Sequence, residues 1–149
     1  MNEAQASTTR AVRVLTVGQR RFGIFDEEID TIVGWRPPTP LPNAPAGILG
    51  VVCVRSRMLT LIAVNLLLDT GADAGKKIVA LRGEEQIGLA VSEARELIDV
   101  DSSELQLPDG KEALTLGVIT ADGQPLSILN SKNLFATAMR GRERRKRQF

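Results

Sequence analysis

The feature that most constrains the fold of this chain is an internal repeat of about 65 residues. Residues 81–100 resemble residues 17–33, and residues 117–129 resemble residues 50–62. The separation is 65 residues in the first pair and 67 in the second. Because glycines and apolar positions keep their mutual spacing in both pairs, we interpret the chain as a duplicated unit, and two copies are too few for a solenoid. The matched positions are Gly18 with Gly83, Phe22 with Ile87, Gly23 with Gly88, Ile24 with Leu89, Ile32 with Leu97, Val33 with Ile98, Gly50 with Gly117, and Leu61 and Ile62 with Ile128 and Leu129.

Each copy has the pattern of short β-strands joined by hairpins. Apolar and polar residues alternate on both sides of a turn at residues 18–21, which is typical of a hairpin with one buried face. Two β-branched runs, 50–54 and 58–64, flank a second turn at residues 55–57. Residues 28–33 are expected to form a helical turn or a strand that ends near Trp35.

A unit of this size is expected to close into a small barrel, because closure removes the exposed edges of the sheet. Two such barrels are expected side by side. Since a unit of about 60 residues is marginally stable alone, the barrels should share an apolar seam, and exchange of a strand is one way to build it. The Gly- and Ala-rich segment 69–77 is the expected junction. Helix is expected in short turns and in a C-terminal stretch, where Leu134, Phe135, Ala138 and Met139 form an apolar stripe.

The segment RPPTPLPNAPAG (36–47) holds five of the seven prolines. Proline fixes φ and has no amide donor, so this connector loses little entropy on ordering and is expected not to join a sheet edge. We interpret it as a stiff strut between the two hairpins, with a polyproline ligand for an SH3 module as the alternative. Its prolines are Pro37, Pro38, Pro40, Pro42 and Pro45.

The residue types present exclude most catalytic chemistry. The 149 residues are 43% hydrophobic and 25% charged, which suits one core or two small fused cores. The chain has no histidine, which removes Ser-His and Cys-His pairs, His-ligated zinc and imidazole bases. Neither a P-loop nor a dinucleotide-binding glycine motif occurs. We therefore expect no enzyme activity, no cofactor, no metal site and no small-molecule substrate.

The single cysteine and the N-terminal residues bear on the cellular compartment. Cys53 lies in the apolar run GVVCV, so we interpret it as a buried small hydrophobic residue in a reducing compartment, with a reactive thiol as the alternative. No apolar run approaches the roughly 20 residues that cross a bilayer, and residues 1–10 have no apolar signal region. A cytoplasmic protein with a flexible N-terminus at residues 1–10 is expected.

The net charge of +1 averages a mildly acidic body and a basic tail. Residues 140–149, RGRERRKRQF, include six basic residues and one acidic residue. Because the only aromatic residue there is Phe149, we interpret the basic tail at residues 137–149 as the frayed, solubilising end of a terminal helix, with binding to nucleic acid or anionic lipid as the alternative. The acidic runs 26–30 and 99–104 are interpreted as solvated faces or turns.

The residues now described resemble a known family. The stretch IDTIVGWRPPTPLPNAPAGILGVVCVRSRMLTLIAVNLL (29–67) resembles the CheW-like domain of bacterial chemosensory systems, which has a hairpin, a connector of the TPLPNAP type and a glycine-led strand in this order. Downstream, IGLAVSEARELIDV (87–100) and GVITADGQPLSILNSKNLF (117–135) resemble the second half of that domain. The resemblance covers about residues 11–136.

The resemblance implies an all-β fold of two SH3-like five-stranded β-barrels packed side by side, with short helical turns and a C-terminal helix. It also implies a non-enzymatic adaptor. Members of the family bridge the cytoplasmic signalling tip of a chemoreceptor and the regulatory domain of a CheA-type histidine kinase. Membrane association would then be indirect, through receptors, and binding of nucleic acid is not expected.

Carried over by position, the resemblance implies a receptor-binding groove near Ile29, Thr31, Arg55, Ala94 and Leu97. Such a groove needs apolar contact and a directional charge to hold a helical receptor tip. Arg55 would supply the charge, because an arginine in a turn between two apolar strands points outward. Core packing is the alternative role of the three apolar members.

Five positions depart from the family pattern. Thr31 stands where a glutamate is common, and Ser56 replaces a turn glycine that permits positive φ. Because these changes remove charge and turn chemistry from the partner side, a diverged accessory protein that binds receptors or array partners without recruiting kinase is an alternative. A small barrel protein with a basic tail that binds nucleic acid or membrane is another. The remaining departures are Cys53, Thr60 and Ala63, which stand where asparagine, proline and aspartate are usual.

Overall fold

The computed structural model describes residues 9–70, 76–105 and 114–146, with side chains described as far as Arg140. The strands are β1 (Thr9–Val17), β2 (Arg20–Phe25), β3 (Ile29–Gly34), β4 (Ile48–Val54), β5 (Arg57–Ala63), β6 (Lys77–Leu81), β7 (Ile87–Val91), β8 (Glu93–Asp101), β9 (Thr115–Ala121) and β10 (Gln124–Leu129). The helical elements are the 3-10 turns η1 (Asp26–Glu28) and η2 (Ser102–Glu104) and the α-helices α2 (Val64–Leu68) and α3 (Ser131–Lys146). Residues 28–33 therefore contain both of the expected forms, a helical turn and then a strand.

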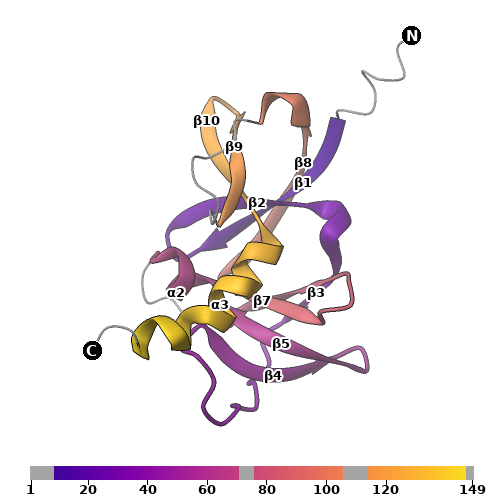
Figure 1. Ribbon diagram of the computed structural model, residues 1–149. Helices are drawn as coiled ribbons and strands as arrows, with labels where there is room; N and C mark the ends of the chain where they lie inside the picture. The colour runs from indigo at the N-terminus through magenta and orange to yellow at the C-terminus, as the bar shows by residue number, and fades with distance from the viewer. Residues whose placement is uncertain (1–8, 71–75, 106–113, 147–149) are drawn as a thin grey trace.

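The described strands form two five-stranded sheets, each curled into a small barrel of the SH3-like type (Figure 1). Barrel A has the strand order β8, β1, β2, β10, β9, and barrel B has the order β3, β6, β7, β5, β4. The β9–β10 hairpin lies at one end of the molecule and the β4–β5 hairpin at the other. The predicted mainly β architecture of paired small barrels is confirmed.

The two repeats exchange strands between the barrels. Strands β1 to β5 come from the first repeat and β6 to β10 from the second, and replacing each strand by its equivalent converts one sheet order into the other. Barrel A combines β1 and β2 with β8, β9 and β10, whereas barrel B combines β6 and β7 with β3, β4 and β5. The exchange is therefore larger than the single strand considered from the sequence. Barrel B is built from the consecutive strands β3 to β7, whereas barrel A is discontinuous along the chain.

The segment 69–77, expected to join the barrels, does not separate them. Strand β5 before it and strand β6 after it both belong to barrel B. Residues 71–75 of this segment lie outside the described residues. The chain instead passes between barrels at η1, between β2 and β3, and at residue Ser92, between β7 and β8.

The apolar core consists of one cluster in each barrel and a larger cluster between them. The cluster of barrel A contains Val12, Val14, Phe25, Val100, Ile119, Leu126 and Ile128. The cluster of barrel B contains Val52, Val54, Leu59, Leu61, Ile78, Ala80 and Ala90. The seam cluster, drawn from both barrels, α2 and α3, contains Leu15, Val17, Phe22, Ile24, Ile29, Ile48, Ile62, Val64, Val79, Leu81, Ile87, Leu89, Val91, Leu129, Leu134 and Ala138. Because the seam holds the most buried residues, each barrel depends on the other for its stability.

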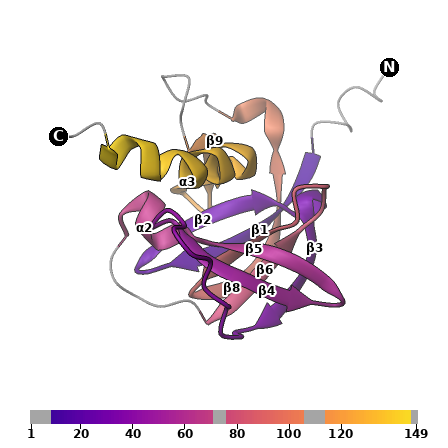
Figure 2. The same ribbon diagram turned by 60° about the horizontal axis from the view of Figure 1, so that its bottom comes forward.

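Helix α3 covers one side of the junction between the barrels (Figures 1 and 2). Leu134 and Ala138 are buried in the seam cluster, whereas Met139 is half exposed. Two expected boundaries are thereby wrong. The packed domain, expected to end at residue 136, extends to Ala138, which is a core residue on the C-terminal helix that the sequence predicted. The segment 1–10, expected to precede the domain, overlaps β1, which begins at Thr9. Residues 1–8 lie outside the described residues.

The proline-rich connector does join a sheet edge, contrary to the expectation. Thr39, which stands between two prolines, donates its N–H to the carbonyl of Val51 at 2.8 Å and accepts the N–H of Val51 at 2.9 Å. Gly50 makes this approach possible, since a Cβ at that position would collide with the Thr39 carbonyl. The connector therefore protects the edge strand β4 at one point.

The interpretation of Cys53 as a buried residue is wrong, because its side chain is exposed. Val52 and Val54 point into barrel B, and the strand alternation turns Cys53 outward between them. In the sequence, the uninterrupted apolar run GVVCV conceals this alternation.

Candidate functional site

The five residues that the family resemblance indicated, Ile29, Thr31, Arg55, Ala94 and Leu97, are here called the candidate surface. The structure places them on two equivalent edge strands and one turn. Ile29 and Thr31 lie on β3, which is the edge of barrel B, and Ala94 and Leu97 lie on β8, which is the edge of barrel A. Arg55 lies in the β4–β5 turn. Strands β3 and β8 occupy the same position in the two repeats, so the candidate surface draws on the same edge of each barrel.

Burial divides the apolar members of the candidate surface. Ile29 is 7% exposed and belongs to the seam cluster, and Ala94 packs against that cluster. Leu97 is 46% exposed. Core packing is therefore the main role of Ile29, and Leu97 is the apolar member that remains accessible to a partner.

Arg55 occupies a tight turn with unusual backbone geometry. Both turn residues have positive φ, 52° at Arg55 and 68° at Ser56, as in the type I′ turns that suit hairpins. Residues other than Gly, Asn and Asp are uncommon in this conformation, so the turn is strained. Both side chains are exposed, and Arg55 points outward, as expected.

Arg57 brings this turn close to the start of β3. Its guanidinium lies 3.1 Å from the carboxylate of Asp30 and donates to the carbonyl of Leu81 at 3.4 Å. Asp30 lies between Ile29 and Thr31 in β3. The ion pair of Arg57 with Asp30 therefore links β3 to a residue only two positions after Arg55.

The acidic run 26–30 contains a turn, η1, as expected, and its carboxylates also make contacts that the sequence did not suggest. Its four carboxylates each bind a residue from another element, and these elements belong to both barrels and to α3. The pairs are Asp26 with Arg13 at 3.7 Å, Glu27 with Arg10 at 2.9 Å, Glu28 with Ser131 at 2.8 Å and Asp30 with Arg57 at 3.1 Å. The sequence signal for this role was the density of carboxylates alone, since the crossing of the chain between the barrels at η1 is visible only in the structure. The second acidic run does contain a turn, as expected, because the Asp101 carboxylate accepts the N–H of Ser103 at the start of η2.

Arg13, like Arg57, binds both a carboxylate of the acidic run and a backbone carbonyl. Besides its ion pair with Asp26, it donates to the carbonyl of Arg95 at 3.0 Å. Arg95 lies between Ala94 and Leu97 along the edge of barrel A. Neither arginine was singled out from the sequence, because each carbonyl acceptor is recognisable only after the strands have paired.

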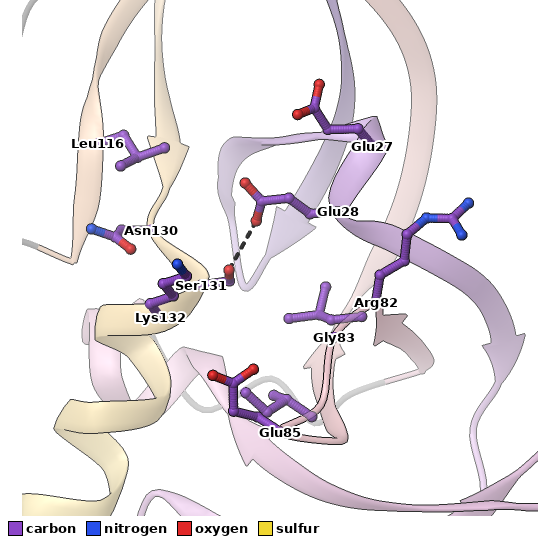
Figure 3. Close-up of a pocket in the computed structure, with 11 residues that line it drawn as sticks. Glu27, Glu28, Arg82, Gly83, Glu85, Leu116, Asn130, Ser131 and Lys132 are labelled. Atoms are coloured by element: carbon purple, nitrogen blue, oxygen red, sulfur yellow. Dashed lines mark hydrogen bonds between the residues drawn. The ribbon is translucent and has the colours of Figure 1, made fainter.

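A cavity of about 490 Å³ lies beside the acidic run, between η1, the β6–β7 loop and the start of α3 (Figure 3). Figure 3 shows Glu28 turned toward Ser131, while the side chains of Glu27 and Arg82 point away from it. The Ser131 hydroxyl donates to Glu28 Oε1, which places a carboxylate at the helix N-terminus where backbone N–H groups favour negative charge. The arrangement fixes the first turn of α3 to η1, and we assign it a structural role.

The chemistry of the candidate surface is that of protein contact. It combines an exposed leucine and an exposed arginine with half-buried neighbours, which suits a partner with an apolar face and a complementary charge. In the described part of the chain, no three His, Cys, Asp or Glu side chains are grouped so that they could hold a metal ion. The longest described helix, α3, has 16 residues and is too short and polar to cross a bilayer.

Comparisons with known proteins agree with this description. A family model described as the CheW-like domain matches residues 12–139. The chain is 25% identical over 140 residues to "Chemotaxis protein CheW" of Rhizobium meliloti, with 88% of this chain and 90% of that protein covered. It is 24% identical over 142 residues to "Probable chemotaxis protein CheW" of Rhizobium etli, with 85% and 88% covered.

A solved structure also resembles the fold. The crystal structure of the scaffolding protein TtCheW from Thermoanaerobacter tengcongensis superposes with a TM-score of 0.73 and 19% sequence identity. The superposition covers 81% of this chain and 88% of that one. At this level of identity, the similarity shows a shared fold.

Proposed function

The chain belongs to the CheW-like domain family of chemotaxis scaffolds, and from this membership we propose that it is a non-enzymatic adaptor that couples chemoreceptor signalling tips to a CheA-type histidine kinase. The observation that carries the proposal is the family match, which spans residues 12–139 and therefore both barrels. The partners in this proposal are the receptor tip and the regulatory domain of the kinase. The protein would act in the cytoplasm and meet the membrane only through receptors.

The candidate surface supports the receptor half of the proposal. Leu97 offers exposed apolar area on β8, and Arg55 offers an exposed cation on the β4–β5 turn. Among the described residues, Arg55 has no ion-pair partner of its own, so its charge is available to a partner. An apolar contact beside a directional charge suits a helical receptor tip.

Purified components test the proposal directly. The full chain is immobilised and exposed separately to a receptor signalling fragment and to a CheA regulatory domain, and binding is measured by surface plasmon resonance. We expect both to bind. Receptor binding without kinase binding would support the accessory adaptor in place of the coupling protein, and binding of neither would contradict both.

Surface variants then test the location of receptor binding. Leu97→Asp and Arg55→Glu are expected to weaken receptor binding by about tenfold or more, since each removes a complementary contact and introduces an opposing charge. Leu66→Asp on α2 and Arg82→Glu in the β6–β7 loop are matched controls, because both residues are exposed and lie outside the candidate surface. If the controls weaken binding as much as the test variants, the site lies elsewhere.

A further inference from the structure

We propose that Arg13 and Arg57 are positioning residues that hold the parts of the candidate surface in register with one another. The proposal rests on the proposed function, since it concerns the same receptor-binding surface. Both arginines bind the acidic run 26–30, in which Asp26 and Asp30 lie on either side of the start of β3. Each arginine joins one of these carboxylates to a backbone carbonyl on a neighbouring strand.

Arg57 connects the β4–β5 turn to β3. One guanidinium nitrogen lies 3.1 Å from Asp30 Oδ2 and the other donates to the Leu81 carbonyl at 3.4 Å, so the side chain spans β3 and β6 together. The side chains of Arg57 and Asp30 are each 30% exposed. Because Arg57 begins β5, which is next to the edge strand β4, this contact links that side of barrel B to its other edge strand, β3. The strained turn that carries Arg55 is thereby fixed relative to Ile29 and Thr31.

Arg13 connects β8 to the same acidic run from the other barrel. It lies 3.7 Å from the Asp26 carboxylate and donates to the Arg95 carbonyl at 3.0 Å. Arg13 is paired with Leu97 in the ladder between β1 and β8, and the register shifts next to it, between Arg13 and Leu15. A β-bulge loosens the local ladder. The Arg13 contact therefore restrains β8 where the strand pairing is irregular and where Ala94 and Leu97 are presented.

The chemistry of these contacts favours arginine specifically. A guanidinium has several N–H donors in a planar fork, so it can bind a carboxylate and a carbonyl at the same time. Partly exposed ion pairs contribute little to global stability. Loss of either contact is therefore expected to leave the fold intact and to release one part of the candidate surface.

Hydrogen exchange and receptor binding measured on the full chain test the proposal. We compare Arg13→Met and Arg57→Met with the wild type, because methionine retains much of the apolar stem. Amide exchange is expected to accelerate at residues 93–98 in Arg13→Met and at residues 54–58 in Arg57→Met. Receptor binding is expected to weaken about fivefold in each and more in the double variant, since the two contacts act on different strands. Arg57→Lys is expected not to restore binding, because an ammonium cannot reproduce the fork.

Arg10→Met is the matched control. Arg10 also lies on β1 and pairs with the same acidic run through Glu27, and its guanidinium lies over the Phe25 ring. Within the described residues, its side chain makes no hydrogen bond or ion pair with β8 or the β4–β5 turn. It should change neither the exchange at the two segments nor receptor binding by more than about twofold.

The outcomes separate this proposal from the proposed function. A wild-type chain that binds no receptor fragment contradicts the proposed function, while the exchange data still decide whether the arginines restrain the two segments. Unchanged exchange at both segments overturns the positioning role. Weaker binding with unchanged exchange also overturns it, because the arginines would then contact the partner themselves. Full rescue by Arg57→Lys would show that charge alone is sufficient and would contradict the bridging geometry.

Discussion

The β4–β5 hairpin of barrel B and the β9–β10 hairpin of barrel A are equivalent in the two repeats, but their surroundings differ. The turn of the first is Arg55-Ser56, and the turn of the second is Asp122-Gly123, the usual composition for a type I′ turn. In barrel B the proline connector bridges the edge strand at Thr39, and an ion pair links Arg57 to Asp30. The equivalent positions in barrel A hold Gln124 and Arg95, which cannot form an ion pair.

The two segments that cross between the barrels also differ in their side-chain contacts, which are charged in the first and neutral in the second. The first crossing, residues 26–30, is held by side-chain contacts to both barrels and to α3. The second crossing relies on Ser92, whose N–H donates to the Thr16 carbonyl at 2.8 Å and whose hydroxyl accepts the Gly18 N–H at 3.0 Å. Duplication thus preserved the strand framework, while the connections acquired different chemistry. The charged crossing lies in the half that carries Ile29, Thr31 and Arg55.

The largest expected difference concerns two equivalent core glycines. A methyl group at Gly23 would lie 2.6 Å from Val12 and 2.9 Å from Ile128, whereas at Gly88 its nearest neighbour would be Ile78 at 3.3 Å. Gly23→Ala is therefore expected to destabilise the protein by about 2–3 kcal/mol through overpacking. Gly88→Ala is expected to change stability by less than about 1 kcal/mol, because the tighter contact is offset by the better strand propensity of alanine.

Urea unfolding of the two variants measures this difference. Equal destabilisation by the two substitutions would show that the barrels are equally tightly packed at these positions.

The second prediction concerns the covered edge of barrel B. Gly50→Ala places a methyl group against the Thr39 carbonyl, which must move and lose its bridge to Val51. We expect a loss of about 1.5–2 kcal/mol together with faster amide exchange at Thr39 and Val51. Gly34→Ala is the control, because a methyl group there would meet nothing within 4 Å. A stable Gly50→Ala variant with a protected Thr39 amide would show that the glycine is not needed for the bridge.

The third prediction exchanges the residues of the two turns. Ser56→Gly is expected to stabilise the protein by about 0.5–1 kcal/mol, because glycine adopts positive φ without steric cost. The reciprocal change, Gly123→Ser, should destabilise it by about 1 kcal/mol, since φ is 77° there. Thermal unfolding of both variants measures the pair of effects. Shifts of the same sign would mean that turn strain does not distinguish the hairpins.

The smallest effect is expected at the starts of the two equivalent helices. Ser131 of α3 binds Glu28, whereas Val64 occupies the equivalent position in α2 and is buried in the seam cluster. Ser131→Ala is expected to destabilise the protein by about 0.5–1 kcal/mol, because one hydrogen bond is lost while Asn130 still caps the helix. Chemical denaturation checks this value. A larger loss would show that Glu28 is the main anchor of α3.

The local elements were predictable because they depend on short-range patterns. Alternation of apolar residues indicated both hairpins, and the spacing of Leu134 and Ala138 indicated the buried face of α3. Cys53 was misplaced because its neighbours are apolar on both sides, so the pattern did not reveal which face of β4 it occupies. The candidate residues Ile29 and Leu97 came from family resemblance, and their different burial was visible only in the fold.

The amino-acid sequence by itself determined that this protein is a duplicated, mainly β chain without histidine chemistry, because composition, periodicity and repeat spacing are properties of the chain. Only the tertiary structure decided which strands share a barrel. Parallel pairing of β2 with β10 and of β5 with β7 joins different repeats, and the two copies are so alike that each hairpin could pair within its own repeat or with the other. Burial of the shared seam settles that choice. The contacts of Arg13 and Arg57 were also decided by the tertiary structure, since residues far apart along the chain become neighbours only after the strands have paired.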